Sequence, residues 1–174
     1  METIIQIYTG DGKGKTTAAL GLALRTAGGG MKVFIGQYFK AGKIISSEEK
    51  ALEKIKNITF KKYDIESPLF SPDVPLAVIK NKAVKAFDDS VKAFKSGKYG
   101  LVVLDELTYL INLKLIKESE VIRALKKKHK NTEVVITGRA ASKGLIEIAG
   151  LVTEMKNIKH PYDKGLKARK GIEF

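Results

Sequence analysis

The residues best suited to chemistry lie in a glycine- and lysine-rich segment near the start of the chain, Thr9–Thr16, which reads TGDGKGKT. A β-branched run, Ile4–Tyr8, precedes this segment, and a run of helix formers begins at Thr17. Glycines let the backbone turn its N–H groups inward around anionic oxygens, and a following helix points the positive end of its dipole at the same place. The segment therefore predicts a phosphate-binding loop.

This loop departs from the usual P-loop signature at its first position. The signature is Gly-x4-Gly-Lys-[Ser/Thr], and Thr9 replaces its first glycine, while Gly14, Lys15 and Thr16 match. Lys15 is expected to reach the terminal phosphates as a point charge, and the Thr16 hydroxyl is expected to bind Mg²⁺ or Mn²⁺. A flexible surface turn is the alternative, which the strand before the loop and the helix after it disfavour.

A second set of chemical groups ends the apolar run Leu101–Asp105, where the carboxylates of Asp105 and Glu106 follow each other. In open α/β sheets, ligands bind at the carboxyl ends of the strands, which is also where a loop after the first strand lies. Asp105 or Glu106 is therefore expected to complete the Mg²⁺ shell with Thr16, directly or through water. An exposed acidic turn is the alternative.

Apolar strand candidates alternate with helical stretches along the chain, which is typical of right-handed βαβ units. The expected strands are Ile4–Tyr8, Lys32–Gln37, Ile58–Tyr63, Leu101–Asp105, Glu133–Thr137 and Leu151–Met155. The expected helices are Thr16–Ala27, Ser47–Lys56, Leu76–Ser96, Ser119–Lys128 and Ser142–Ala149. These elements predict an α/β P-loop nucleotide-binding fold in a single domain over residues 1–174, with a mostly parallel sheet of about six strands and helices on both faces.

Two connecting segments have a composition of their own. The stretch Ser67–Pro75 holds a proline cluster and predicts an ordered loop or lid before the long helix. The segment after Met155 is basic and contains glycines, so it is expected to be irregular and to pack over the site or over a neighbour.

Composition excludes several kinds of site. The 174 residues are 44% hydrophobic, which is enough for one sizeable core. No apolar run approaches the ~20 residues of a membrane span and no signal-peptide pattern opens the chain, so a cytoplasmic protein without membrane contact is expected. The absence of cysteine excludes disulfides, thiolate metal sites and cysteine nucleophiles, and the two histidines cannot build a zinc site alone.

The formal net charge of +13 raises the question of nucleic-acid binding. Only four of the 32 basic residues are arginine, and the lysines are spread along the chain instead of forming a patch. The densest run, Lys126–Lys130, falls where a helix is expected to end, and cations are favourable there. No nucleic-acid partner is therefore expected.

Several segments agree in order and spacing with one known family over almost the whole chain. They are Tyr8–Ala18 (YTGDGKGKTTA), Val102–Tyr109 (VVLDELTY), Ile136–Arg139 (ITGR), Lys159–Gly165 (KHPYDKG) and Lys170–Glu173 (KGIE). Together they resemble the ATP:corrinoid (cob(I)alamin) adenosyltransferases of the P-loop type. Many ATPases share the loop, whereas the DELTY and KHPYDKG stretches are much more specific to this family.

The resemblance implies an unusual use of the phosphate loop. These enzymes bind ATP in reversed orientation, and a Co(I) corrinoid attacks the ribose 5′ carbon, so that triphosphate is released. Because the corrinoid is itself the nucleophile, the protein needs no serine, cysteine or general base. The substrates implied are ATP and a reduced corrinoid, with a reduced flavoprotein as electron donor and a homodimer as the assembly.

The expected site residues come from the loop, the first helix and the ends of later strands. The catalytic residues are Lys15, Thr16 and Glu106, and the metal ligands are Thr16, Asp105 and Glu106. The nucleotide-binding residues are Gly10, Asp11, Gly12, Lys13, Gly14, Lys15, Thr16, Thr17, Arg25 and Arg139. Arg25 could equally lie on a solvated helix face and Arg139 in a structural salt bridge. Tyr109, Tyr162 and His160 could be packing residues.

Two departures from the family concern the corrinoid. Well-known members carry an N-terminal extension that helps to cover the corrin ring, whereas this sequence begins only three residues before its first expected strand. They also carry a Phe-x-Trp pair that helps to expel the lower axial base. This chain has no tryptophan, and Tyr63 or Phe70 is the expected substitute. An ordinary P-loop ATPase or phosphotransferase is the main alternative function, and a basic nucleotide-responsive nucleic-acid binder is the next.

Overall fold

The computed structural model describes residues 3–39, 46–161 and 165–172. Its strands form one six-stranded sheet in the order β3-β2-β4-β5-β1-β6, and every pairing is parallel. The strands are β1 (Ile5–Thr9), β2 (Val33–Gln37), β3 (Ile58–Lys62), β4 (Leu101–Asp105), β5 (Glu133–Thr137) and β6 (Leu151–Glu154). The expected α/β fold with a parallel sheet is confirmed.

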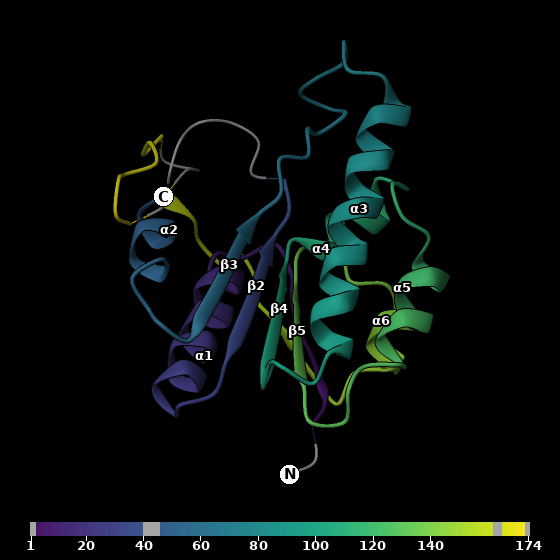
Figure 1. Ribbon diagram of the computed structural model, residues 1–174. Helices are drawn as coiled ribbons and strands as arrows, with labels where there is room; N and C mark the ends of the chain where they lie inside the picture. Colours follow the sequence, from purple (N-terminus) through teal and green to yellow (C-terminus); the bar gives the residue numbers. More distant parts are fainter. Residues whose placement is uncertain (1–2, 40–45, 162–164, 173–174) are drawn as a thin grey trace.

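Helices cover both faces of this sheet (Figure 1). They are α1 (Lys15–Gly28), α2 (Ser47–Leu52), α3 (Leu76–Lys95), α4 (Leu107–Asn112), α5 (Glu118–Leu125) and α6 (Lys143–Glu147). The side chains of α1 and α2 share one core with β2, β4 and β5, while α3 to α6 contribute to the other. The buried stripe of α1 is Ala19, Ala23 and Ala27, whose small side chains let the helix lie close to the strands. Within the described ranges, no helix is long and apolar enough to cross a membrane.

The structure adds one helix to the expected set and ends several of the expected helices earlier, α2 and α6 among them. Helix α4, which the sequence did not predict, begins directly after Glu106 because that residue takes a left-handed conformation (φ 64°) that breaks the apolar run into strand and helix. Helix α2 ends at Leu52 rather than Lys56, because Leu52 and Ile55 form successive turns toward β3. Helix α6 ends before Gly150, whose N–H bonds to the carbonyl of Ile5 as the chain enters β6.

The carboxyl ends of the strands define the functional edge of the sheet. Gln37 pairs with Asp105 across β2 and β4, and Leu104 pairs with Ile136 across β4 and β5. The end residues of three adjacent strands therefore lie in one row. The loop between β3 and α3 rises beyond this same edge (Figure 1).

Candidate functional site

The phosphate loop joins β1 to α1 and rests against the chain that leaves β6. Gly10 (φ 99°) and Gly14 (φ 120°) take conformations that favour glycine, and Gly14 is the N-cap of α1. A Cβ on Gly12 would lie 2.7 Å from the carbonyl oxygens of Met155 and Lys156. The Gly12 N–H instead donates to the Met155 carbonyl at 2.7 Å. Glycine is thus required at position 12 by the close contact with the chain that follows β6, and at positions 10 and 14 by the backbone conformation.

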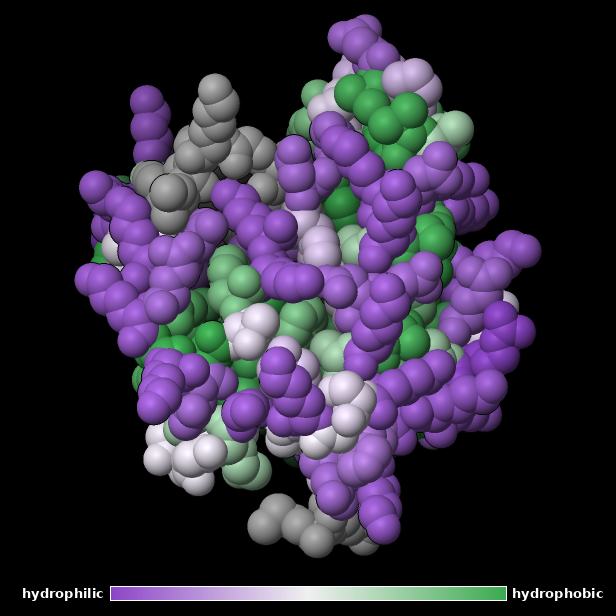
Figure 2. All heavy atoms as spheres, viewed as in Figure 1, coloured by the Kyte–Doolittle hydropathy of each residue, from purple (hydrophilic) through white to green (hydrophobic). Residues whose placement is uncertain are grey.

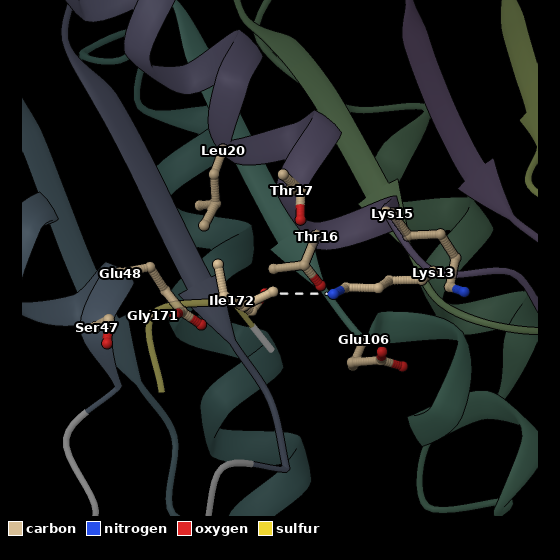
Figure 3. Close-up of a pocket in the computed structure, with 11 residues that line it drawn as sticks. Lys13, Lys15, Thr16, Thr17, Leu20, Ser47, Glu48, Glu106, Gly171 and Ile172 are labelled. Atoms are coloured by element: carbon tan, nitrogen blue, oxygen red, sulfur yellow. Dashed lines mark hydrogen bonds between the residues drawn. The ribbon is translucent and has the colours of Figure 1, made fainter. Parts of the chain in front are cut away.

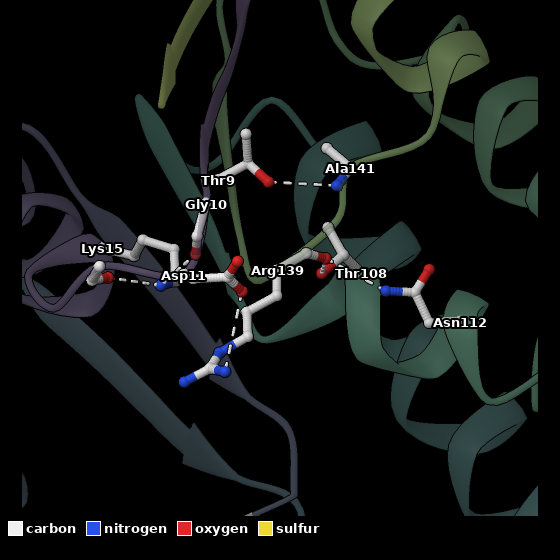
Figure 4. A network of polar contacts seen from close by, with 9 residues as sticks. Thr9, Gly10, Asp11, Lys15, Thr108, Asn112, Arg139 and Ala141 are labelled. Atoms are coloured by element: carbon white, nitrogen blue, oxygen red, sulfur yellow. Dashed lines mark hydrogen bonds and ion pairs between the residues drawn. The ribbon is translucent and has the colours of Figure 1, made fainter. Parts of the chain in front are cut away.

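Lys15 is the first residue of α1 and is almost completely buried, with 7% of its surface exposed. Its Nζ donates to the carbonyls of Gly10 at 2.7 Å and Gly12 at 2.8 Å, so the side chain turns back along the loop (Figure 4). Burial lowers the pKa of Lys15, and the charge of Glu106 opposes that shift. The ammonium group is therefore held over the loop, where phosphate oxygens can replace the carbonyls as acceptors.

Asp105 connects α1 to the ends of three strands and is 1% exposed. Its Oδ1 accepts from Thr16 Oγ1 at 2.8 Å and from Thr137 Oγ1 at 2.6 Å, and its Oδ2 accepts from Gln37 Nε2 at 2.9 Å. The structure thus brings together Thr16 and Asp105, which the sequence predicted as partners. Gln37 and Thr137 were missed, although each is a polar residue at the end of a predicted strand.

Glu106 lies next to this cluster at the junction of β4 and α4. Its backbone N–H donates to Thr137 Oγ1 at 2.9 Å. A Cβ on the facing Gly138 (φ 137°) would collide with Thr108 Oγ1 and touch the Glu106 carboxylate. Thr108 Oγ1 also donates to the Arg139 carbonyl at 2.7 Å, which fixes the start of α4 against the end of β5.

A cavity of about 500 Å³ opens beside the loop (Figure 3), a size typical of small-molecule sites. Its lining includes predicted site residues, namely Lys13, Gly14, Lys15, Thr16, Thr17 and Glu106. It also includes Leu20, Ser47 and Glu48, which the sequence did not indicate, and Gly171 and Ile172 from the segment that was expected to pack over the site or over a neighbour. Lys13 Nζ donates to the Ile172 carbonyl at 3.3 Å. The segment that contains Ile172 therefore lies against the phosphate loop at the cavity.

The two predicted arginines lie in different places. The Arg139 guanidinium is 3.7 Å from the Asp11 carboxylate, so it lies above the loop, where both side chains are exposed (Figure 4). Arg25 is an exposed residue in the last turn of α1, at the other end of that helix from Lys15, and it is not among the residues that line the cavity.

The aromatic and histidine residues proposed for the site also lie in different places. Tyr109 packs edge-on against Phe39, with ring centroids 4.8 Å apart. His160 is partly buried in the segment that follows β6, and the cavity lining does not include it. Tyr162 lies outside the described residues.

Tyr63 and Phe70 have very different surroundings. Tyr63 stacks on Tyr38 at 5.3 Å and donates from its hydroxyl to Asp89 at 2.8 Å, and burial raises its pKa. Phe70 is 83% exposed in the loop between β3 and α3, next to the exposed Leu69. Apolar side chains gather at the end of this loop on a largely hydrophilic face (Figure 2). Of the two aromatics, Phe70 is the more exposed, whereas Tyr63 is partly buried.

The oxygen atoms around Thr16 suit a hard cation that is bound partly by the protein and partly by the nucleotide. Within the described ranges, no group of three or more carboxylate or imidazole residues could hold a metal ion by itself. Thr16 and Glu106 both line the cavity and offer oxygen atoms. Mg²⁺ is usually bound in this way, by one or two protein oxygens together with water and substrate phosphates.

Comparison with known proteins agrees with this geometry. The sequence matches the family model described as "ATP:corrinoid adenosyltransferase BtuR/CobO/CobP" over residues 1–174. A corrinoid adenosyltransferase from Sinorhizobium sp is 35% identical over 172 residues, which cover 98% of this chain and 80% of the relative. The Escherichia coli K12 corrinoid adenosyltransferase is 33% identical over 172 residues, covering 98% of this chain and 85% of that protein. The chain therefore belongs to the ATP:corrinoid adenosyltransferase family.

Proposed function

We propose that this protein transfers the 5′-deoxyadenosyl group of ATP to the cobalt of a reduced corrinoid and releases triphosphate. The observation that carries the proposal is a phosphate loop whose Thr16 hydroxyl bonds to Asp105, beside a cavity that Glu106 also lines, in a chain of this family. The corrinoid Co(I) supplies the nucleophile. The protein has to hold ATP, orient the ribose carbon and stabilise the leaving group.

Leaving-group stabilisation is the task for which the loop is best equipped. Lys15 and the loop N–H groups at the start of α1 place positive charge where the triphosphate would accumulate negative charge. Lys13 at the cavity wall and Arg139 above the loop add two further cations. One well-placed donor of this kind is worth about 3 kcal/mol in the transition state.

Mg²⁺ or Mn²⁺ fits the oxygen donors at the cavity wall and would neutralise part of the triphosphate charge when bound. Thr16 and Glu106 would hold it, with Asp105 behind them.

The corrinoid would approach from the carboxyl edge of the sheet, where Phe70 is exposed. Cobalt has to be reduced before it attacks, and a reduced flavoprotein is the proposed donor, because the resemblance to the family implies one. We also propose a homodimer in the cytoplasm, and the lack of cysteine fits that reducing compartment.

Product analysis tests the proposal. Attack at the ribose carbon breaks a carbon–oxygen bond and keeps the three phosphates joined, whereas a phosphotransferase or ATPase breaks a bond to phosphorus. With ATP, Mg²⁺, a strong reductant and cobalamin or cobinamide, we expect triphosphate and a light-sensitive adenosyl-cobalt product in equal amounts. Omission of the corrinoid should abolish both products. Release of ADP and phosphate without a corrinoid would instead identify an ordinary P-loop ATPase.

A further inference from the structure

Gln37 and Thr137 are buried polar residues beside the site whose role the proposed reaction leaves unexplained. They end the strands β2 and β5 on either side of β4, so they flank Asp105 in one row of the sheet. Neither is among the residues that line the cavity of Figure 3. Their hydrogen bonds instead go to Asp105 and to the backbone of Glu106.

Thr137 is bonded to both acidic residues at once. Its hydroxyl donates to Asp105 Oδ1 at 2.6 Å and accepts from the backbone N–H of Glu106 at 2.9 Å. A hydroxyl has a single proton, so these two bonds fix its orientation. The Glu106 backbone is left-handed (φ 64°), a conformation that non-glycine residues keep only where their surroundings hold it.

Both oxygens of the Asp105 carboxylate accept hydrogen bonds from other side chains. Thr16 and Thr137 occupy Oδ1, and Gln37 donates to Oδ2 at 2.9 Å. Because the Thr16 proton points at Asp105, the lone pairs of the Thr16 oxygen are left for a cation on the cavity side. Glu106 lines the cavity and Asp105 is not among its lining residues, so the two carboxylates have different surroundings.

We infer that Gln37 and Thr137 are positioning residues for the metal–nucleotide site. They hold Asp105 so that it orients the Thr16 hydroxyl, and Thr137 also holds Glu106 at the cavity wall. Glu106 and Thr16 then face the metal, and Asp105 acts from behind them. The inference rests on the proposed function in one respect only, namely that a metal–ATP complex binds in this cavity.

The substitution Thr137→Val tests the inference, because valine keeps the shape of threonine and removes both hydrogen bonds. Thr137→Ser is the matched control, because serine keeps the hydroxyl. ATP binding is measured by calorimetry at increasing Mg²⁺ without corrinoid, and Mn²⁺ binding in the presence of ATP by electron paramagnetic resonance. We expect Thr137→Val to raise the metal concentration at half-saturation by ~10-fold or more, as is typical for groups that orient metal ligands. Thr137→Ser should restore most of the affinity.

Gln37→Met is the second variant, because it removes the other donor to Asp105 at similar side-chain length, and it decides the question if Thr137→Val does not fold. Urea unfolding of each ligand-free variant measures the structural effect separately. Folded variants that lose stability but keep the wild-type metal dependence would show that these residues only satisfy a buried carboxylate. Equal losses in Thr137→Val and Thr137→Ser would also overturn the inference. These measurements use no corrinoid, so they stand even if the product analysis excludes adenosyl transfer.

Discussion

At the scale of single residues, Lys15 combines burial with a purely local set of bonds. Its ammonium group contacts two carbonyls of its own loop, and no hydrophobic core depends on its side chain. Burial disfavours the charged form of this side chain, and its pKa is accordingly lowered. A buried cation that stabilises little else is best explained by an anionic ligand at the loop.

Replacing Lys15 with alanine should therefore leave the fold intact and reduce turnover by at least ~100-fold, because the developing triphosphate charge loses its buried cation. Circular dichroism and thermal unfolding check the fold, and formation of adenosyl-corrinoid measures turnover. Lys13→Ala is the comparison, since Lys13 is exposed, and its loss should be smaller. Normal turnover in folded Lys15→Ala would remove this lysine from the mechanism.

At the scale of elements, the loop depends on β6 as much as on β1 and α1. Gly12 touches the chain just after β6, and the N–H of Met155 donates to the carbonyl of Thr9 at 2.8 Å. The residue that follows this edge strand, Met155, thus bonds to the loop at both Thr9 and Gly12. Every residue of β6 is exposed, so its main contribution is this backbone support.

The change Gly12→Ala should weaken both ATP binding and stability, because its Cβ would force the loop away from Met155 and Lys156. We expect a loss of about 1–3 kcal/mol in the free energy of unfolding, as is common for overpacked sites. Gly21→Ala in α1 is the control: nothing lies within 4 Å of its new Cβ, and alanine favours a helix by up to ~1 kcal/mol. Urea unfolding and ATP calorimetry compare the two, and a Gly12→Ala protein as stable and as tight-binding as the control would contradict this account.

At the scale of the whole molecule, the site is assembled at one edge from distant parts of the chain. The loop, the start of α2, Glu106 and the segment at Gly171 surround a single cavity. The loop that carries Phe70 rises beyond the same edge. Phe70 is exposed on this loop, which makes it the aromatic side chain to test for contact with a large second substrate.

If Phe70 helps to displace the lower axial base, then Phe70→Ala should slow the reaction from enzyme-bound Co(II) corrinoid and spare the reaction with chemically supplied Co(I). The two assays separate activation from transfer. Tyr63→Phe is the control, because it keeps the ring stacked on Tyr38 and removes the hydroxyl that bonds to Asp89. Equal losses in both assays, or none in either, would exclude a special role for Phe70.

The sequence by itself determined what depends on neighbours along the chain. The glycine-rich loop between strand and helix, the apolar run that ends in Asp105 and Glu106, and the alternation that predicts a parallel sheet are local patterns, and backbone chemistry is enough to read them. Only the tertiary structure decided which strand ends meet. Gln37 and Thr137 come to Asp105 because β2 and β5 flank β4, and strand order is set by packing across the whole sheet. For the same reason, the contact of Gly12 with Met155 had no local signal, and the basic composition of the last segment predicted that it packs over the site or a neighbour without predicting the bond of Lys13 to Ile172.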